Sequence, residues 1–315
     1  MIAATYSETG ASDVLTVGEI DTPQPGPGEV RVKLAVAGVN PTDWKFRAGS
    51  TGTLNFPFQV PGQDGAGVID ALGEGVAKAW KGERVWVYLA AWQSPYGTAA
   101  QYTIVPVEKA VPLGDASFEL GASLGVPALT AYHCLFSDGP IEGKRVLVAG
   151  GAGAVGHAAI ELAKWGGAEV VTTVSSAEKA ELASAADVIV NYREDGAAEK
   201  IGKVDRIVEV ALGPNLQLDL AVANEHATIV SYAADQPTAE LPVRAAMTAN
   251  LTLKFMLLYT IPEPAKHDAI GGVSKAVNVG ALTTQPLHRF PLAETAAAHD
   301  AVQQGAVGKV VIDAA

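Results

Sequence analysis

Polar and apolar residues alternate along the first third of the chain. The segment Val30–Val36 places an apolar side chain at every second position, which is typical of a strand with one buried face. The patterns at Gly65–Ile69 and Arg84–Tyr88 predict two further strands, and a cluster of Pro and Gly at 23–28 marks a turn before the first. This spacing of short strands predicts an antiparallel, barrel-like module over residues 1–118.

The pattern changes near residue 119. Residues 119–136 have a helical, small-residue-rich pattern that Pro127 interrupts, and short apolar strands then alternate with helices. We expect strands at Arg145–Ala149, Glu169–Val174, Asp187–Val190, Arg206–Val210, Ala227–Ser231 and Leu251–Leu258, and helices at His157–Trp165 and Ala177–Ala185. Nearly all-apolar strands that alternate with helices indicate a parallel sheet covered on both faces. A helix at Lys266–Val279 and a strand at Gly308–Ile312 follow. The predicted fold class is therefore α/β, a doubly wound parallel sheet plus an antiparallel β-barrel domain.

A glycine motif lies between the first strand and the first helix of this alternating region. Gly151, Gly153 and Gly156 have the GxGxxG spacing within one βαβ unit, with Ala152, Ala154 and Val155 between them. In such a motif the first glycine permits a tight turn, the second lets the backbone approach a pyrophosphate, and the third allows close helix–strand packing. The helix N-terminus offers unpaired N–H groups to the phosphates. The alternative is a glycine-rich turn without a ligand, and the context favours a dinucleotide site.

The residues after the second strand of this region indicate which dinucleotide binds. A site that prefers NAD places Asp or Glu there, whereas this chain has Ser175 and Ser176, with no carboxylate before Glu178. The two hydroxyls and Lys179 can hold a 2′-phosphate without like-charge repulsion. Tyr192, followed by Arg193, would lie over the adenine and the phosphate. NADPH is favoured over NADH, although Lys179 can also be read as a solvated helix residue.

Charge and cysteine content exclude several classes of function. The chain has 22 basic and 34 acidic residues and a net charge of −12, which disfavours nucleic acid and anionic membranes as partners. A single cysteine, Cys134, permits no internal disulfide, and we interpret it as a small buried residue rather than a nucleophile. The N-terminus lacks the pattern of a signal peptide, and no apolar window is long enough for a membrane span. We therefore expect a soluble, intracellular protein.

Several further motifs give the whole chain a family resemblance. They are Gly38–Asp43, Pro61–Gly67, Gly97–Tyr102, Gly125–Tyr132, the glycine loop, Asn191–Glu194 and Gly308–Val311. With them the chain resembles the medium-chain dehydrogenases/reductases, and within that superfamily the zinc-free NADPH:quinone oxidoreductases related to zeta-crystallin. The resemblance implies a GroES-like catalytic domain formed by residues 1–118 and 262–315, and a Rossmann domain at 119–261. It also implies an active site in the cleft between them and a cytosolic homodimer.

The resemblance also bears on zinc. Zinc alcohol dehydrogenases of the same superfamily carry a cysteine where Asn40 stands and a His-Glu pair where Gln63 and Asp64 stand. The six histidines are scattered, and zinc needs three or four such ligands close together. We therefore expect no catalytic metal, and hydride transfer to an acceptor that is already electrophilic.

The resemblance further implies site residues, each with a plainer alternative. Thr130 would lie near the nicotinamide, Asn40 near the cofactor or the substrate carbonyl, and Asp43 and Gln63 at the pocket floor. The alternatives are a turn residue for Asn40, a helix cap for Asp43 and a packed core residue for Thr130. The residues expected to contact the cofactor are Ser231, Tyr232, Phe255, Leu257 and Lys309. Phe255 and Leu257 can also be read as core, and Lys309 as solvent-facing. Lys45 or Arg47 could stabilise a reduced oxygen, although we favour surface charges for both.

Three functions remain open from the sequence. The first is an NADPH-dependent quinone reductase, and the second is a 2-alkenal or enoyl reductase on the same scaffold. A non-catalytic NADPH-binding protein is the third. The expected substrate is a small quinone or enone.

Overall fold

The computed structural model describes residues 1–234 and 236–314. The chain forms two compact units, residues 1–126 with 286–315 and residues 127–285. The sequence placed the corresponding boundaries at 118/119 and 261/262. The second unit extends to residue 285 rather than 261, because the helix at 263–278 packs against the helix at 129–136, which belongs to the second unit.

The first unit is built on a mainly antiparallel sheet with strand order β14-β15-β3-β4-β5-β7, in which β14 and β15 pair in parallel. Strand β6 adds to this sheet by pairing antiparallel with β3. Its strands are β1 (Ile2–Thr5), β2 (Thr16–Glu19), β3 (Glu29–Gly38), β4 (Asp64–Leu72), β5 (Arg84–Val87), β6 (Tyr102–Pro106), β7 (Ala110–Pro112), β14 (Leu287–Pro291) and β15 (Lys309–Asp313). The helices are α1 (Pro41–Arg47), α2 (Phe118–Gly121) and α10 (Thr295–Gln303). Val30, Val32 and Leu34 are buried at alternate positions of β3, which confirms the period-two pattern.

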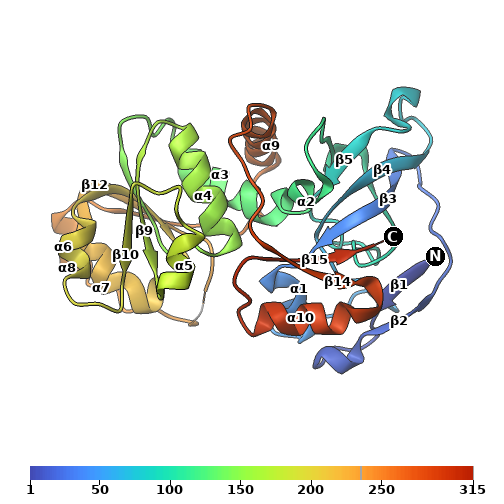
Figure 1. The fold of residues 1–315 in the computed structure, drawn as a ribbon, viewed down its shortest axis with the longest axis horizontal. Helices are drawn as coiled ribbons and strands as arrows, with labels where there is room; N and C mark the ends of the chain where they lie inside the picture. The colour runs from blue at the N-terminus through green and yellow to red at the C-terminus, as the bar shows by residue number, and fades with distance from the viewer. Residues whose placement is uncertain (235, 315) are drawn as a thin grey trace. The chain divides into compact units, whose positions relative to one another are not determined.

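Both ends of the chain contribute to this sheet. The C-terminal strand β15 pairs antiparallel with β3, so Val311 lies opposite Gly38 (Figure 1). On the other side β15 pairs with β14, the first strand after the chain returns from the second unit. Strand pairing therefore brings residues near 40 and near 309 together.

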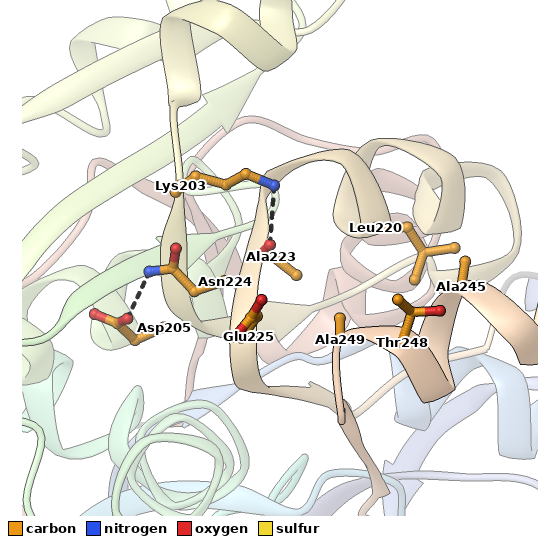
Figure 2. Close-up of a pocket in the computed structure, with 9 residues that line it drawn as sticks. All are labelled: Lys203, Asp205, Leu220, Ala223, Asn224, Glu225, Ala245, Thr248 and Ala249. Carbon is orange, nitrogen blue, oxygen red and sulfur yellow. Dashed lines mark hydrogen bonds between the residues drawn. The ribbon is translucent and has the colours of Figure 1, made fainter.

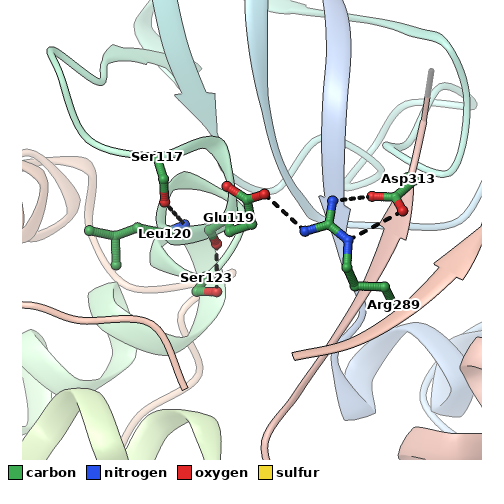
Figure 3. Close-up of polar contacts among 6 residues, drawn as sticks. All are labelled: Ser117, Glu119, Leu120, Ser123, Arg289 and Asp313. Carbon is green, nitrogen blue, oxygen red and sulfur yellow. Dashed lines mark hydrogen bonds and ion pairs between the residues drawn. The ribbon is translucent and has the colours of Figure 1, made fainter. Parts of the chain in front are cut away.

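An ion cluster ties α2 to the two C-terminal strands (Figure 3). Ser117 caps α2 by accepting a hydrogen bond from the Leu120 N–H at 3.1 Å. Arg289 of β14 donates to Glu119 at 2.9 Å and to both carboxylate oxygens of Asp313. The last helix of the first unit before the crossover is thus held to the strands that complete the sheet.

The second unit is a parallel six-stranded sheet with the order β10-β9-β8-β11-β12-β13. Its strands are β8 (Arg145–Val148), β9 (Glu169–Val174), β10 (Val188–Asn191), β11 (Val204–Glu209), β12 (Ala223–Ser231) and β13 (Thr252–Phe255). The helices are α3 (Leu129–Phe136), α4 (Ala154–Trp165), α5 (Ala177–Glu181), α6 (Ala197–Ile201), α7 (Leu212–Val222), α8 (Val243–Thr248) and α9 (Glu263–Asn278). Helix α3 packs on α4 and α9, and α6 packs on α7 (Figure 1).

Counted along the chain, this strand order is 3-2-1-4-5-6, that of the doubly wound dinucleotide-binding fold. The predicted fold class is confirmed. Pro127 lies in a π-helical turn at Leu124–Ala128, where the sequence showed an interrupted helix. Across the described residues, we find no helix long and apolar enough to cross a membrane.

Candidate functional site

The glycine loop follows β8 at the topological switch point, where the strand order reverses between β8 and β11. In open parallel sheets ligands bind beyond the carboxyl ends of the strands at this point. The left-handed residue of the turn is Gly150 (φ +72°) rather than Gly151. Gly151 is needed for packing, because a Cβ there would collide with Thr172 of β9 and with Ile160 of α4.

The other two glycines behave as the motif predicts. A Cβ on Gly153 would meet only the Gly150 carbonyl oxygen, 3.5 Å away, so this side of the turn is open to a ligand. A Cβ on Gly156 would collide with the turn itself, so glycine lets α4 start close to the strand. The loop is also fixed from β9, whose Thr173 accepts hydrogen bonds from the N–H groups of Gly150 and Gly151.

The residues expected around the 2′-phosphate come together at the ends of β9 and β10. These strands are parallel neighbours, and Val174 lies opposite Asn191. Ser176 is the N-cap of α5, where its hydroxyl accepts a hydrogen bond from the Lys179 N–H. Ser175 and Lys179 are half-buried beside it, and Tyr192 is 45% exposed. The arrangement has hydroxyls, an amine and an aromatic face where an NAD site has a carboxylate.

The carboxyl ends of β12 and β13 carry the remaining expected contacts of the second unit. Ser231 is buried and its hydroxyl donates to the Ala233 carbonyl. Tyr232 follows it and is half-buried. Phe255 is 72% exposed and Leu257 is 53% exposed, so the alternative that placed them in the core is wrong.

A buried pair of carboxyl groups that the sequence analysis missed lies beside the switch point. Glu209 ends β11 and accepts hydrogen bonds from the Ala211 N–H and the Asn215 amide. Asp219 of α7 is buried next to it, and burial together with the Glu209 charge raises its pKa. A proton on Asp219 therefore stabilises the pair. Glu209 in turn fixes the loop after β11 by accepting the hydrogen bond from the Ala211 N–H. A carboxylate within the otherwise apolar segment Ile207–Val210 was the available signal.

The first unit contains a second buried polar cluster, around Asn40. Asn40 precedes α1, Asp64 begins β4 and Lys309 begins β15, and both strands pair with β3. The Asn40 amide donates to Asp64 at 2.6 Å, and its carbonyl oxygen accepts from the Lys309 ammonium at 2.8 Å. The Val126 N–H donates to the other Asp64 oxygen at 2.8 Å. Asp64 was not among the predicted site residues, although it directly follows Gln63.

Asp43 and Gln63 lie in the same unit. The Asp43 carboxylate accepts from the Asn40 N–H at 2.8 Å, the bond expected of the third helical residue in a capping box. Gln63 is buried, and no hydrogen bond to its side-chain oxygen is found within the described part of the chain. Asn40, Asp43 and Gln63 are therefore brought together, whereas Thr130 belongs to α3 of the second unit, where it is buried.

Burial dominates the electrostatics of this cluster. It raises the pKa of Asp43 to about 7 and that of Asp64 to about 6. The neighbouring Asp64 charge raises the Asp43 pKa further, and the Lys309 ammonium opposes the shift of both. Burial lowers the pKa of Lys309. The solvent-facing alternative for Lys309 is wrong, since its ammonium is held by Asn40 and by the Val39 carbonyl.

Three further interpretations can be compared with the structure. Arg47 is 1% exposed, so the surface reading is wrong for it, while Lys45 is half-buried. Arg47 ends α1, which packs against α10, and no local sequence pattern indicates this contact between distant elements. Cys134 is buried, which confirms the interpretation as a small buried residue, and burial raises its pKa to about 12, which argues against a nucleophile.

A hollow of about 830 Å³ lies at the opposite edge of the parallel sheet (Figure 2). It is lined at the amino-terminal ends of β11 and β12, where Asp205 accepts from Asn224 at 2.7 Å and Lys203 donates to the Ala223 carbonyl at 3.1 Å. Lys203 and Asp205 are thus engaged within the protein, whereas Glu225, the other charged residue of the lining, is exposed. Because ligands of this fold bind at the carboxyl edge, this hollow is not the dinucleotide site.

Two family models match the chain. The alcohol dehydrogenase GroES-like domain matches residues 26–115, and the zinc-binding dehydrogenase family matches residues 154–271. A quinone oxidoreductase from Lama guanicoe is 30% identical over 326 residues, covering 99% of this chain and 97% of the relative. A 2-haloacrylate reductase from a Burkholderia species is also 30% identical, over 95% of this chain and 94% of the relative.

The fold comparison agrees with these similarities. A mycobacterial protein solved in complex with NADPH superposes with a TM-score of 0.86 at 29% identity, covering 99% of both chains. The first unit has the GroES-like fold and the second the Rossmann fold that the sequence predicted.

Proposed function

Because this chain belongs to the quinone oxidoreductase branch of the medium-chain dehydrogenase/reductase superfamily, we propose that it reduces quinones with NADPH and without zinc. The observation that carries the proposal is the form of the dinucleotide site. An open glycine turn lies at the switch point, and the neighbouring strand β9 is followed by the hydroxyls of Ser175 and Ser176, with Lys179 nearby, instead of a carboxylate.

The residues of the second unit fit NADPH. The face of Gly153 that lacks a side chain has room for a pyrophosphate, and the first turn of α4 supplies N–H donors. Ser175, Ser176 and Lys179 would hold the 2′-phosphate, and Tyr192 would cover the adenine. Ser231, Tyr232, Phe255 and Leu257 would flank the nicotinamide end. When bound, NADPH supplies the hydride.

The Asn40 cluster would stabilise charge on the substrate. An amide nitrogen has two N–H donors, and Asp64 takes one, which leaves the other for a quinone or enone oxygen. Lys309 polarises the same amide through its carbonyl oxygen, which makes the remaining N–H a stronger donor. Gln63 and Thr130 would complete the contacts with substrate and nicotinamide. Asp43, with a pKa of about 7, holds a proton near neutral pH.

The donor set of this cluster argues against a catalytic zinc. Zinc needs three or four thiolate, imidazole or carboxylate ligands close together. This cluster offers two carboxylates, those of Asp43 and Asp64, and its other polar groups include the neutral amides of Asn40 and Gln63. The Asn40 oxygen already accepts from an ammonium group, which a nearby zinc ion would repel. We expect activity to survive prolonged treatment with a metal chelator; a loss of activity that added zinc restores would contradict this mechanism.

A second candidate function is the reduction of conjugated C=C bonds, which the similarity to 2-haloacrylate reductase favours. Both reactions use the same cofactor site and the same donor to an oxygen. The alternative that is not an enzyme is a non-catalytic NADPH-binding protein. The raised pKa values and buried charges at Asn40 weigh against it, because perturbed groups cluster at active sites.

The deciding experiment follows reduced-cofactor absorbance with the purified protein. NADPH and NADH are each tested against an ortho-quinone, a para-quinone and a simple enone. Turnover of NADPH with quinones only supports the proposed function. Turnover with the enone only would establish the C=C reductase, and NADPH binding without any turnover would establish the binding protein.

We also propose that the protein is a cytoplasmic homodimer formed by extending the parallel sheet. Within the described chain β13 pairs with β12 alone and is the end strand of the sheet. Large apolar side chains are exposed on and near it: Leu241, Val243, Met247, Phe255 and Leu257. An exposed edge strand with apolar side chains beside it is a template for pairing. Light scattering after size-exclusion chromatography measures the oligomeric state. We expect a dimeric wild type and a monomeric Thr252→Pro variant on β13. A monomeric wild type would contradict the proposal.

A further inference from the structure

The segment that leads from the second unit back to the first is bonded to the cofactor-binding region. Thr283 donates to Glu161 of α4 through its backbone N–H at 2.9 Å and through its hydroxyl. Two residues later, the Gln285 amide donates to the Ala152 carbonyl oxygen at 2.9 Å. Gln285 is 6% exposed, which is unusual for a polar side chain on a connecting segment.

Ala152 lies in the middle of the glycine turn, so this bond acts on the turn directly. The Ala152 carbonyl and the Gly153 N–H belong to one planar peptide unit and move together. Gln285 binds the carbonyl end, and the Gly150 carbonyl accepts from the Gly153 N–H at 3.0 Å. The peptide plane is therefore fixed at both ends. The position of the open Gly153 face depends on Gln285 as well as on residues within the loop.

The next residue along the chain is anchored in the other unit. The Pro286 carbonyl accepts from the Lys309 N–H at 2.9 Å, and a Cβ on Gly308 would collide with it. Lys309 is the residue whose ammonium binds Asn40. Pro286 therefore belongs to the first unit, with β15, whereas Gln285 belongs to the second unit, with the glycine turn.

We propose that Gln285 is a positioning residue for the dinucleotide, which holds the Ala152–Gly153 peptide in the orientation that receives the pyrophosphate. Gln285 touches the loop and not the ligand, so its effect is on the shape of the loop before cofactor binds. The part of this inference that concerns NADPH rests on the proposed function. The part that concerns the order of the loop stands without it.

The test compares Gln285→Met, which keeps the length of the side chain and removes the donor, with Thr283→Val. The control variant loses the hydrogen bonds of the Thr283 hydroxyl to Glu161 and His157 of α4 but none to the glycine turn. Hydrogen exchange of peptides spanning 148–157 is measured first, without cofactor. We expect faster exchange in Gln285→Met than in Thr283→Val and the wild type. Equal exchange in all three proteins would overturn the positioning role, whatever the cofactor is.

Binding is then titrated with NADPH and with adenosine 2′-monophosphate, which carries the 2′-phosphate but no pyrophosphate. A single hydrogen bond predicts a Kd for NADPH about three- to tenfold weaker in Gln285→Met. The Kd for the monophosphate should not change, because Gln285 acts on the turn that receives the pyrophosphate, which this ligand lacks. A general loss of structure would instead weaken the binding of both ligands. Equal weakening of both ligands, or an unchanged Kd for NADPH despite faster exchange, would overturn the link to the dinucleotide. A wild type that fails to bind NADPH would instead contradict the proposed function.

Discussion

The ammonium of Lys309 lies 2.8 Å from the side-chain oxygen of Asn40, and the two residues are 269 positions apart in the chain. Through the same amide Asn40 also binds Asp64. A carboxylate, an amide and an ammonium thus form a line in the interior of the first unit. Neither charge is exposed to water, so each depends on the other for stabilisation.

Replacing Lys309 alone should therefore be costly. Lys309→Met leaves the Asp64 charge buried without its cation, and removal of one partner of a buried pair costs about 3–5 kcal/mol of unfolding free energy. The double variant Lys309→Met with Asp64→Asn should recover part of that loss, because no isolated charge remains. Urea unfolding gives the unfolding free energy of the two single variants, Lys309→Met and Asp64→Asn, and of the double variant. Strictly additive losses would show that the two groups do not interact.

Lys179 should decide the choice between the two nicotinamide cofactors. Lys179→Glu places a carboxylate near the end of β9, where it repels a 2′-phosphate and can accept hydrogen bonds from ribose hydroxyls. We expect the KM for NADPH to rise at least about tenfold, as one close like-charge contact allows, and the preference to shift to NADH. Lys78→Glu, an exposed change of the same charge in the first unit, is the control. Unchanged KM values for both cofactors would remove Lys179 from the site.

Asp43 should make stability fall as the pH rises. Its pKa is about 7 in the folded protein and near 4 in the unfolded chain, so between these values only the folded state keeps the proton. The contribution of Asp43 to the unfolding free energy is fully present below about pH 4. It is lost at up to about 1.4 kcal/mol per pH unit as the pH rises toward and through 7. Asp64 adds to this fall below about pH 6, and the lowered pKa of Lys309 acts in the opposite direction at alkaline pH.

The variant Asp43→Asn isolates that contribution, because an amide can still accept the bond from the Asn40 N–H. Its unfolding free energy should increase relative to the wild type between pH 5 and pH 8. Asp21→Asn, an exposed position, should track the wild type throughout. A constant difference between Asp43→Asn and the wild type would mean that Asp43 titrates normally.

Two adjacent glycines of α9 should respond in opposite directions to the same substitution. A Cβ on Gly272 would collide with the Tyr132 ring of α3, whereas a Cβ on Gly271 meets nothing within 4 Å. Gly272→Ala should lower the unfolding free energy by about 1–3 kcal/mol through overpacking. Gly271→Ala should raise it by up to about 1 kcal/mol, because alanine favours the helix. Thermal unfolding of the pair checks both signs, and destabilisation by Gly271→Ala would refute the packing argument.

The sequence predicted the second unit better than the first. Apolar strands and the GxGxxG spacing are local patterns, so the strands at Arg145 and Glu169 and the loop between them were found without tertiary information. The partners of Asn40 were not, because β3 brings Asp64 and Lys309 together by strand pairing across the whole chain.

Local sequence patterns also failed to predict the solvent exposure of individual side chains. Arg47 looks like a surface cation in the sequence but is buried where α1 packs against α10. Phe255 lies in an apolar strand, yet it is exposed because β13 is the end strand of its sheet. In both cases a distant element, and not the neighbouring residues, sets the environment of the side chain.

The division of the chain sets an order of assembly during synthesis. Residues 127–285 are continuous, so this unit has its whole sequence once residue 285 has left the ribosome. The first unit was begun earlier but must wait for β15, the strand that pairs with β3. Since domains fold as units during translation, the portion that starts first finishes last. Until Lys309 arrives, Asn40 and Asp64 lack their cation, and the nascent chain carries an incomplete sheet edge at β3.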